Sequence, residues 1–176
     1  MKSVLISIQP RWCELIANGE KTNEARKTRP KIDEAFKCYI YCTKENIDIQ
    51  HKKIWWHKDS TGYAHIMNGK AIGEFVCDYT TYMQNPFTGE IYPDILIASF
   101  LTQKEADTYA NGRTLYGWHI SDLKIYDKPK ELSEFALCKP KYQLIDKNDY
   151  ISRYREVTHL RKAPQSWQYI ESEENQ

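Results

Sequence analysis

Short stretches in which apolar and polar residues alternate recur along the chain and predict β-strands. In the first of them, Val4, Ile6 and Ile8 lie two residues apart and give the strand one strongly apolar face. An apolar run at 91–100 follows a turn at 85–89. Further strands are predicted, from alternation or from aromatic and β-branched content, at 22–28, 36–43, 71–79, 118–126 and 166–170.

Two helices are marked by the residues at their ends. Pro10 can open the first helix because its missing N–H is not needed at that position, and Asn18-Gly19 ends the helix. Thr102 and Glu105 have the spacing of a capping box, in which each satisfies a backbone donor of the other, and Asn111-Gly112 ends this second helix. Both helices are therefore predicted from local signals.

Together these elements predict a β-rich α+β fold. The two helices, and a single helical turn at 132–135, lie between the strands rather than alternating with them, which favours a small mixed β-barrel over a doubly wound sheet. We expect one domain over 1–170, because 176 residues are too few for two domains of ordinary size. Polar, basic stretches at 44–69 and 137–162 are expected to be insertions, and 171–176 an acidic tail.

The chain is nearly neutral, but its charge is unevenly placed. Lys and Arg number 25 against 24 Asp and Glu, for a net charge of +1. Residues 1–31 and 137–162 each carry seven basic and three acidic side chains, or +4, so the rest of the chain carries −7. A uniformly basic protein that coats nucleic acid is excluded, whereas a local phosphate-facing patch is not. The run at 137–162 is either a solvated face or a track for a nucleic-acid backbone.

The sequence also limits the cellular setting and the chemistry. No apolar run is long enough to cross a bilayer, and the apolar stretch after Lys2 ends at Gln9-Pro10, too early for a secretory signal. We expect a cytoplasmic protein with no membrane partner and with its five cysteines as reduced thiols. Neither a Cys/His cluster with ligand spacing nor a glycine-rich phosphate loop occurs, so no metal and no cofactor is predicted.

One short motif carries candidate chemistry, since residues 19–26 read Gly-x-Lys-x-x-Glu-x-Arg. Glu24 and Arg26, two apart on a predicted strand, point to one face and can pair, and Lys21 in the preceding turn can bring its ammonium to the same place. A carboxylate fixed beside two cations can accept from the amino group of a nucleobase while the cations hold a phosphate or a carbonyl oxygen. The alternative is a solvated salt-bridge ladder. A ligand site requires a concave pocket that contains Glu24 and Arg26 beside an aromatic ring.

The motif resembles the signature of the ASCH domain family, whose members have a PUA-like β-barrel. The resemblance extends to 5–10 before the motif and to 71–75 and 117–123 after it, which are similar to strands of that barrel. It leaves 44–69 and 137–162 as additions. The resemblance implies an intracellular module that binds nucleic acid or a nucleotide, RNA ahead of DNA, in a cleft at Lys21, Glu24 and Arg26, and it names no protein partner.

The same resemblance implies an alternative, a small hydrolase. Some ASCH relatives are amidohydrolases that act on acylated cytidine, and ribonuclease activity also occurs in the family. Lys21 would then be the nucleophile or base, with Glu24 or Glu74 as proton carrier. Two points weigh against this: a neighbouring carboxylate raises the pKa of a lysine, and the amidohydrolases have threonine where this chain has Glu24. A second alternative is a protein-interaction domain that uses residues 44–69.

Three tryptophans are candidate ligand-binding residues because their rings can stack on a base. Trp55 and Trp56 lie among lysines, and adjacent residues of a strand face opposite sides, so at most one of the two lines a site. The alternative to stacking is that one of these two tryptophans anchors the loop in the core. Trp118 and Trp167, on predicted barrel strands, belong either to the core or to the wall of a pocket.

Overall fold

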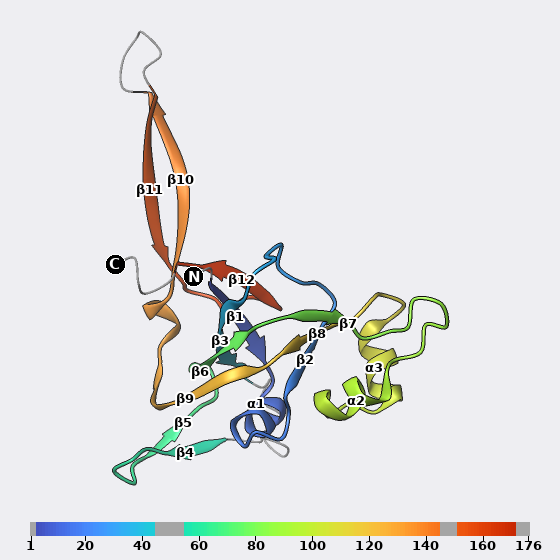
Figure 1. The fold of residues 1–176 in the computed structure, drawn as a ribbon. Helices are drawn as coiled ribbons and strands as arrows, with labels where there is room; N and C mark the ends of the chain where they lie inside the picture. Colours follow the sequence, from blue (N-terminus) through green and yellow to red (C-terminus); the bar gives the residue numbers. More distant parts are fainter. Residues whose placement is uncertain (1–2, 45–54, 145–150, 172–176) are drawn as a thin grey trace.

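The computed structural model describes residues 3–44, 55–144 and 151–171, with 138–144 and 151–155 described by their backbone only. A five-stranded sheet runs through the body of the molecule (Figure 1). The strands in spatial order are β12 (Trp167–Ile170), β1 (Ser3–Ile8), β3 (Phe36–Cys42), β6 (Lys70–Cys77) and β9 (Ser121–Lys130). β1 pairs in parallel with β3 and antiparallel with β12.

A three-stranded sheet contains the motif strand. Its spatial order is β2 (Asn23–Arg26), β8 (Tyr116–His119) and β7 (Thr80–Tyr82), all antiparallel. Two hairpins complete the strands in the described part of the chain, and they pair β4 (Trp56–Lys58) with β5 (Ala64–Ile66) and β10 (Ala136–Leu144) with β11 (Ile151–His159).

Both helices predicted from their ends are confirmed. α1 (Pro10–Ala17) begins at its proline and ends at Asn18. α3 (Gln103–Ala110) has both hydrogen bonds of the capping box between Thr102 and Glu105, and Asn111 ends it in a left-handed conformation. The apolar run at 91–100 forms a further helix, α2 (Pro93–Ser99), and the predicted turn at 132–135 is the 3₁₀ helix η1 (Leu132–Glu134).

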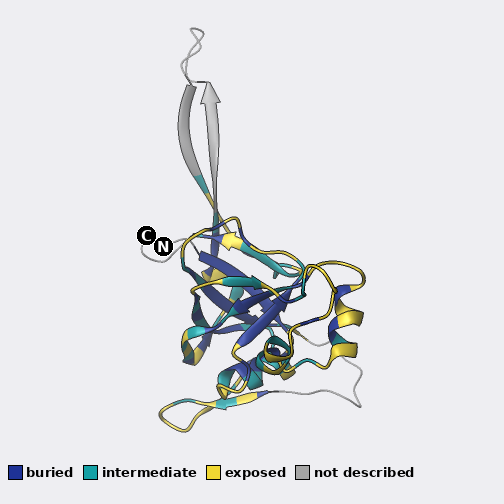
Figure 2. Ribbon diagram, turned by 45° about the vertical axis from the view of Figure 1, so that its right-hand side comes forward, coloured by how far each residue is buried: buried dark blue, intermediate teal, exposed yellow. Residues whose placement is uncertain are grey.

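The core lies on both faces of the five-stranded sheet (Figure 2). β1 is buried at all six positions because a strand lies on each side of it and side chains cover each face. Val4, Ile6 and Ile8 belong to one cluster together with Cys13 and Ile16 of α1. Leu5 points into the opposite cluster, which contains Tyr39 and Phe135. The sequence predicted one apolar face of this strand, whereas the structure buries both.

The predicted α+β class is confirmed, with three α-helices in the described residues and a mostly β core. The single strand predicted at 118–126 is wrong. β8 ends at His119 and β9 begins at Ser121, because the chain crosses from the three-stranded to the five-stranded sheet at this point. Asp122 takes a positive φ of 46° just after the crossing.

The two predicted insertions contain strands. In the first, the described residues include the β4–β5 hairpin, which exposes Trp56, Tyr63 and Ile66, while 45–54 lie outside the described residues. In the second, β10 and β11 form a ribbon that stands away from the sheets (Figure 1). Because these strands form a two-stranded sheet of their own, neither of their faces needs an apolar pattern. No helix in the described residues is long and apolar enough to cross a membrane.

Candidate functional site

The motif residues are placed by the turn after α1 and by β2. Gly19 adopts φ +75°, which a residue without Cβ reaches at no steric cost, and there the chain turns back after the helix. The Thr22 N–H then donates to a carbonyl of α2 at 3.0 Å. This bond fixes the start of β2, so that Lys21, Glu24 and Arg26 come to one place.

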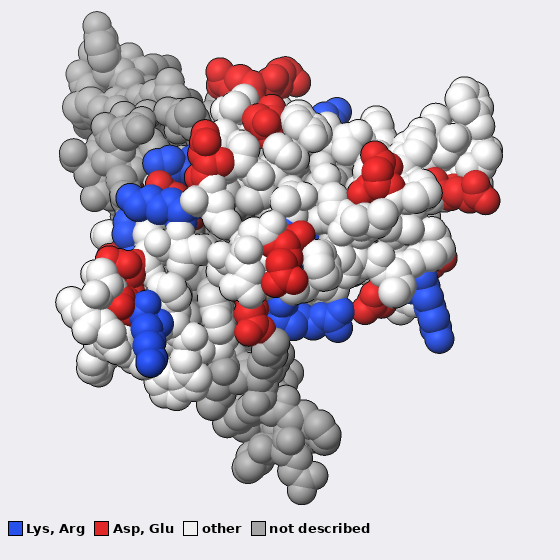
Figure 3. Space-filling view, turned by 60° about the horizontal axis from the view of Figure 1, so that its bottom comes forward, with Lys and Arg blue, Asp and Glu red and all other residues white. Residues whose placement is uncertain are grey.

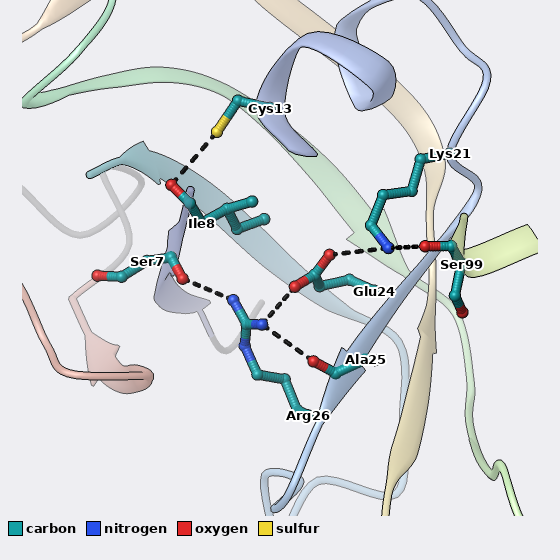
Figure 4. Close-up of polar contacts among 8 residues, drawn as sticks. All are labelled: Ser7, Ile8, Cys13, Lys21, Glu24, Ala25, Arg26 and Ser99. Atoms are coloured by element: carbon teal, nitrogen blue, oxygen red, sulfur yellow. Dashed lines mark hydrogen bonds and ion pairs between the residues drawn. The ribbon is translucent and has the colours of Figure 1, made fainter. Parts of the chain in front are cut away.

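The three side chains form one connected set of polar contacts (Figure 4). Arg26 Nη1 donates to Glu24 Oε1, so the pairing predicted from their spacing is confirmed. Arg26 Nη2 donates to the Ser7 carbonyl oxygen at 2.6 Å. Lys21 Nζ lies 3.3 Å from Glu24 Oε2 and donates to the Ser99 carbonyl oxygen at 2.5 Å. The set therefore ties β2 to β1 and to α2.

The set is almost wholly removed from water, because Lys21, Glu24 and Arg26 are 2%, 3% and 7% exposed. Two cations and one carboxylate leave one positive charge in excess. Burial lowers the pKa of Lys21, and this effect exceeds the opposite one of Glu24, whose charge and contact raise that pKa. The solvated salt-bridge ladder considered above does not fit this burial.

A cavity of about 600 Å³ lies against these residues, between the end of β1, α1, β2 and α3. Two aromatic rings line it, Trp12 of α1 and Tyr109 of α3. Lys21 Nζ lies 5.0 Å from the centre of the Trp12 ring. The full lining consists of Ser7, Ile8, Gln9, Trp12, Lys21, Glu24, Ala25, Arg26, Thr43, Leu101, Lys104, Glu105, Thr108, Tyr109, Gln165 and Ser166.

An ion pair joins the two helices beside this cavity. Arg11 Nη2 of α1 lies 3.0 Å from Glu105 Oε1 of α3, and both side chains are about half exposed. The guanidinium of Arg11 also lies 3.8 Å from the centre of the Trp12 ring. Hydrogen bonds from Thr102 and from Arg11 lower the pKa of Glu105 to about 2. Glu105 therefore stays charged at neutral pH, and it links α1 to the start of α3.

Two atoms of the motif have unused hydrogen-bonding capacity among the residues that the structure describes. Glu24 Oε2 is near the Lys21 ammonium without a hydrogen bond of good geometry, and Arg26 Nε has no acceptor. Both atoms are buried, and polar groups in such a position normally have partners. One acceptor and one donor are thus left on residues that line the cavity.

Comparisons with known proteins identify the fold. No family model matches the sequence, and no curated protein matches it. Solved structures do match: the crystal structure of ASCH from Zymomonas mobilis has a TM-score of 0.59 at 16% identity, and the match covers 99% of this chain and 91% of that one. The chain has an ASCH-type fold. Two mutants of the Zymomonas protein match with TM-scores of 0.57 and 0.56, at 17% and 16% identity, over 99% of this chain and 94% and 92% of theirs.

Within this ASCH-type fold, the three candidate tryptophans do not line the cavity. Trp118 is fully buried and Trp55 is 8% exposed, and both belong to the larger core cluster. Trp167 is half-buried and packs edge-on against Trp118 with ring centres 5.6 Å apart. Trp56 is 55% exposed, so the prediction that the neighbouring tryptophans face opposite ways is confirmed.

The rings that do line the cavity, Trp12 and Tyr109, were not predicted as site residues. They come from α1 and α3, which are far apart in the sequence and meet only in the folded chain. One signal was available for Trp12, because it lies on the helix that leads into the Lys21 turn. Tyr109 shows none, since an exposed tyrosine on a polar helix is ordinary.

The other candidate acid lies elsewhere. Glu74 is on β6, where it accepts a hydrogen bond from the Tyr126 hydroxyl at 2.6 Å and lies 3.5 Å from Lys37 Nζ. It is not part of the cavity lining. No group of three or more metal-ligating side chains occurs among the described residues.

Proposed function

We propose that the protein binds a nucleobase or nucleotide, in RNA ahead of DNA, in the cavity that Lys21, Glu24 and Arg26 line. The observation that carries this proposal is a buried trio with one positive charge in excess, placed against a cavity that two aromatic rings line. The preference for RNA rests on the resemblance to the ASCH family.

The chemistry of the cavity suits such a ligand. A nucleobase offers a flat surface for stacking on Trp12 or Tyr109 and amino groups that a carboxylate can accept from. The excess positive charge favours a phosphate or a carbonyl oxygen near Lys21 or Arg26. A cavity of about 600 Å³ is within the usual range for small ligands.

The test uses the variant Lys21→Met, which removes the charge and keeps the Glu24–Arg26 pair. We expect its affinity for nucleoside monophosphates and for short single-stranded RNA to fall roughly 10- to 150-fold, the range for a lost charge-assisted hydrogen bond. Calorimetry at one fixed salt concentration measures the affinity, and circular dichroism with thermal unfolding verifies the fold.

A second pair of variants tests the ring without disturbing buried charge. Tyr109 is 38% exposed, so Tyr109→Ala is expected to fold and to bind more weakly, while Tyr109→Phe is expected to bind like the wild type. Equal affinities of the wild type, Lys21→Met and Tyr109→Ala would reject the cavity as the binding site.

Hydrolysis at the same cavity is the second candidate, and one observation favours it. Burial lowers the pKa of Lys21, which weakens the objection that Glu24 would keep this amine protonated too strongly to react. Glu24 would then be the proton carrier, because Glu74 does not line the cavity. The deciding experiment incubates the protein with N4-acetylcytidine and with short RNA in the presence of a chelator. Absence of turnover of both compounds would reject this candidate.

A further inference from the structure

The turn after β2 contains three basic residues and begins beside the cavity. Lys27, Arg29 and Lys31 alternate in this turn, directly after Arg26, which lines the cavity. Lys27 Nζ lies 4.9 Å from the centre of the Tyr109 ring, which also lines the cavity. The basic turn, residues 27–31, therefore begins at the cavity wall.

A second hollow of about 450 Å³ lies along the basic turn. All five residues of the basic turn line it, together with Asp33 and the ring of Tyr116. The guanidinium carbon of Arg29 lies 5.7 Å from the centre of that ring. The Tyr82 ring is next, with its centre 5.1 Å from that of Tyr116, and Tyr82 is 55% exposed.

The basic turn is held in place by β12. Trp167 Nε1 donates to Thr28 Oγ1 at 3.0 Å, and the Lys31 N–H donates to the Tyr169 hydroxyl oxygen at 2.9 Å. Thr28, Arg29 and Lys31 are nevertheless exposed. A backbone fixed in this way positions the cations, so less conformational entropy is lost when they meet a ligand.

Cations that follow one another beside exposed aromatic rings are the combination that binds single-stranded nucleic acid: the cations track the phosphates and the rings stack on the bases. A duplex does not offer its bases for stacking in this way.

We propose that the basic turn and the Tyr82–Tyr116 ring pair extend the cavity into a track for single-stranded RNA. A nucleotide in the cavity is followed by phosphates on Lys27, Arg29 and Lys31 and by a base on the exposed face of Tyr82. This rests on the proposed function, because it takes the cavity as the place of the first nucleotide.

The test compares a nucleoside monophosphate with an unstructured RNA of about eight nucleotides, within the range of known single-strand sites. The double variant Arg29→Ala/Lys31→Ala is matched by Lys124→Ala/Lys128→Ala, which removes two exposed cations from β9 at the opposite edge of the sheet from β12. We expect the first variant alone to weaken RNA binding and to reduce the salt slope, log Kd against log salt, by about 1.4, or ~0.7 for each phosphate contact. Both variants should bind the monophosphate like the wild type.

The ring is tested separately. Tyr82→Ala is expected to weaken binding of the RNA roughly 5- to 150-fold, and Tyr82→Phe to leave it unchanged, because stacking needs the ring and not the hydroxyl. Duplex RNA of the same length should bind less tightly than the single strand.

Three results would overturn the track: RNA binding that is no tighter than monophosphate binding, equal effects of the basic-turn and β9 double variants, or equal affinity for duplex and single strand. Failure of the proposed function looks different. If Lys21→Met binds both ligands like the wild type while the basic-turn variant loses RNA, the cavity proposal falls and the basic turn still binds RNA. If Lys21→Met loses both ligands and the basic-turn variant loses neither, only the track falls.

Discussion

The ammonium of Lys21 lies between two opposing influences. Glu24, 3.3 Å away, favours the charged form, and removal from water disfavours it more strongly. Two cations share one carboxylate, so Glu24 cannot compensate both. The buried charge thus costs stability, which is typical of a residue kept for binding or reaction rather than for folding.

The cost at Lys21 predicts how stability depends on pH. Because the pKa of Lys21 is lowered in the folded protein, the unfolded chain binds more protons between that pKa and the unfolded value of about 10.4. Stability contributed by this residue therefore rises with pH in that window. We expect the difference in free energy of unfolding, wild type minus Lys21→Met, to increase in urea denaturation as the pH rises towards the unfolded pKa of about 10.4. A difference that stays flat or falls would contradict the lowered pKa.

Contacts within a few residues could be predicted from the sequence, and contacts between distant residues could not. The Glu24–Arg26 pair follows from strand geometry alone, because residues two apart share a face. Whether Trp118 belongs to the core or to the wall of the pocket could be decided only from the folded structure. Trp118 lies opposite Glu24 in the β2–β8 pairing, yet its ring enters the core beside Phe36 and Trp167.

The position of α3 along the sequence could be predicted, but its part in lining the cavity could not. Its capping box is local and was readable from Thr102 and Glu105. Its contact with α1 is the Arg11–Glu105 pair, and its Ala106 and Ala110 are buried in a cluster with Met83 and Leu115. These contacts join segments that are distant in the sequence. β10 and β11 were missed for the converse reason, since a two-stranded ribbon outside the core imposes little pattern on its sequence.

Glu105 gives α3 an acid-sensitive attachment. Its pKa is lowered to about 2, so the stability it contributes is full above the unfolded value of about 4.3 and is lost as pH falls through 2. Glu105→Gln can keep the capping box but loses the charge that pairs with Arg11. We expect the thermal midpoint of the wild type to exceed that of Glu105→Gln at about pH 6, and this gap to close towards about pH 2.

Salt provides the control for this attachment. Both partners are about half exposed, so added salt should narrow the gap at pH 6 as well. A gap of constant size from about pH 6 to pH 2 would show that the charge of Glu105 has no role in holding α3.

On the scale of the whole molecule, the candidate site lies where separate parts of the fold meet. The cavity uses the end of β1, the first helix, the three-stranded sheet and α3, so no single segment of sequence contains it. Charge alone does not mark it: on the face shown in Figure 3, acidic and basic side chains are interspersed with wide uncharged areas. Residues 1–31, with a net charge of +4, contribute two separate features to the folded chain. One is the buried trio of Lys21, Glu24 and Arg26, and the other is the basic turn that follows it.

The β10–β11 ribbon is the part of the molecule whose removal should matter least to the rest. Its base is fixed to the body, since the Leu160 N–H donates to the Phe135 carbonyl at 2.8 Å and both side chains lie in the smaller cluster on the other face of the sheet. Beyond the base, the ribbon stands away from the sheets, and its strands form a sheet of their own (Figure 1).

Lys139 and Glu156 pair in register, so an Asn-Gly turn can join them in place of 140–155. We expect this shortened chain to unfold within about 2–4 °C of the wild type, which corresponds to about 1 kcal/mol, because an isolated ribbon is only marginally stable. It should also bind a nucleoside monophosphate unchanged, because the described lining of the cavity includes no residue of the ribbon. Its affinity for longer RNA decides between the two interpretations of the basic run: an unchanged value means a solvated face, and a loss means a second contact with the backbone. A much lower midpoint would instead show that the ribbon is part of the folding unit.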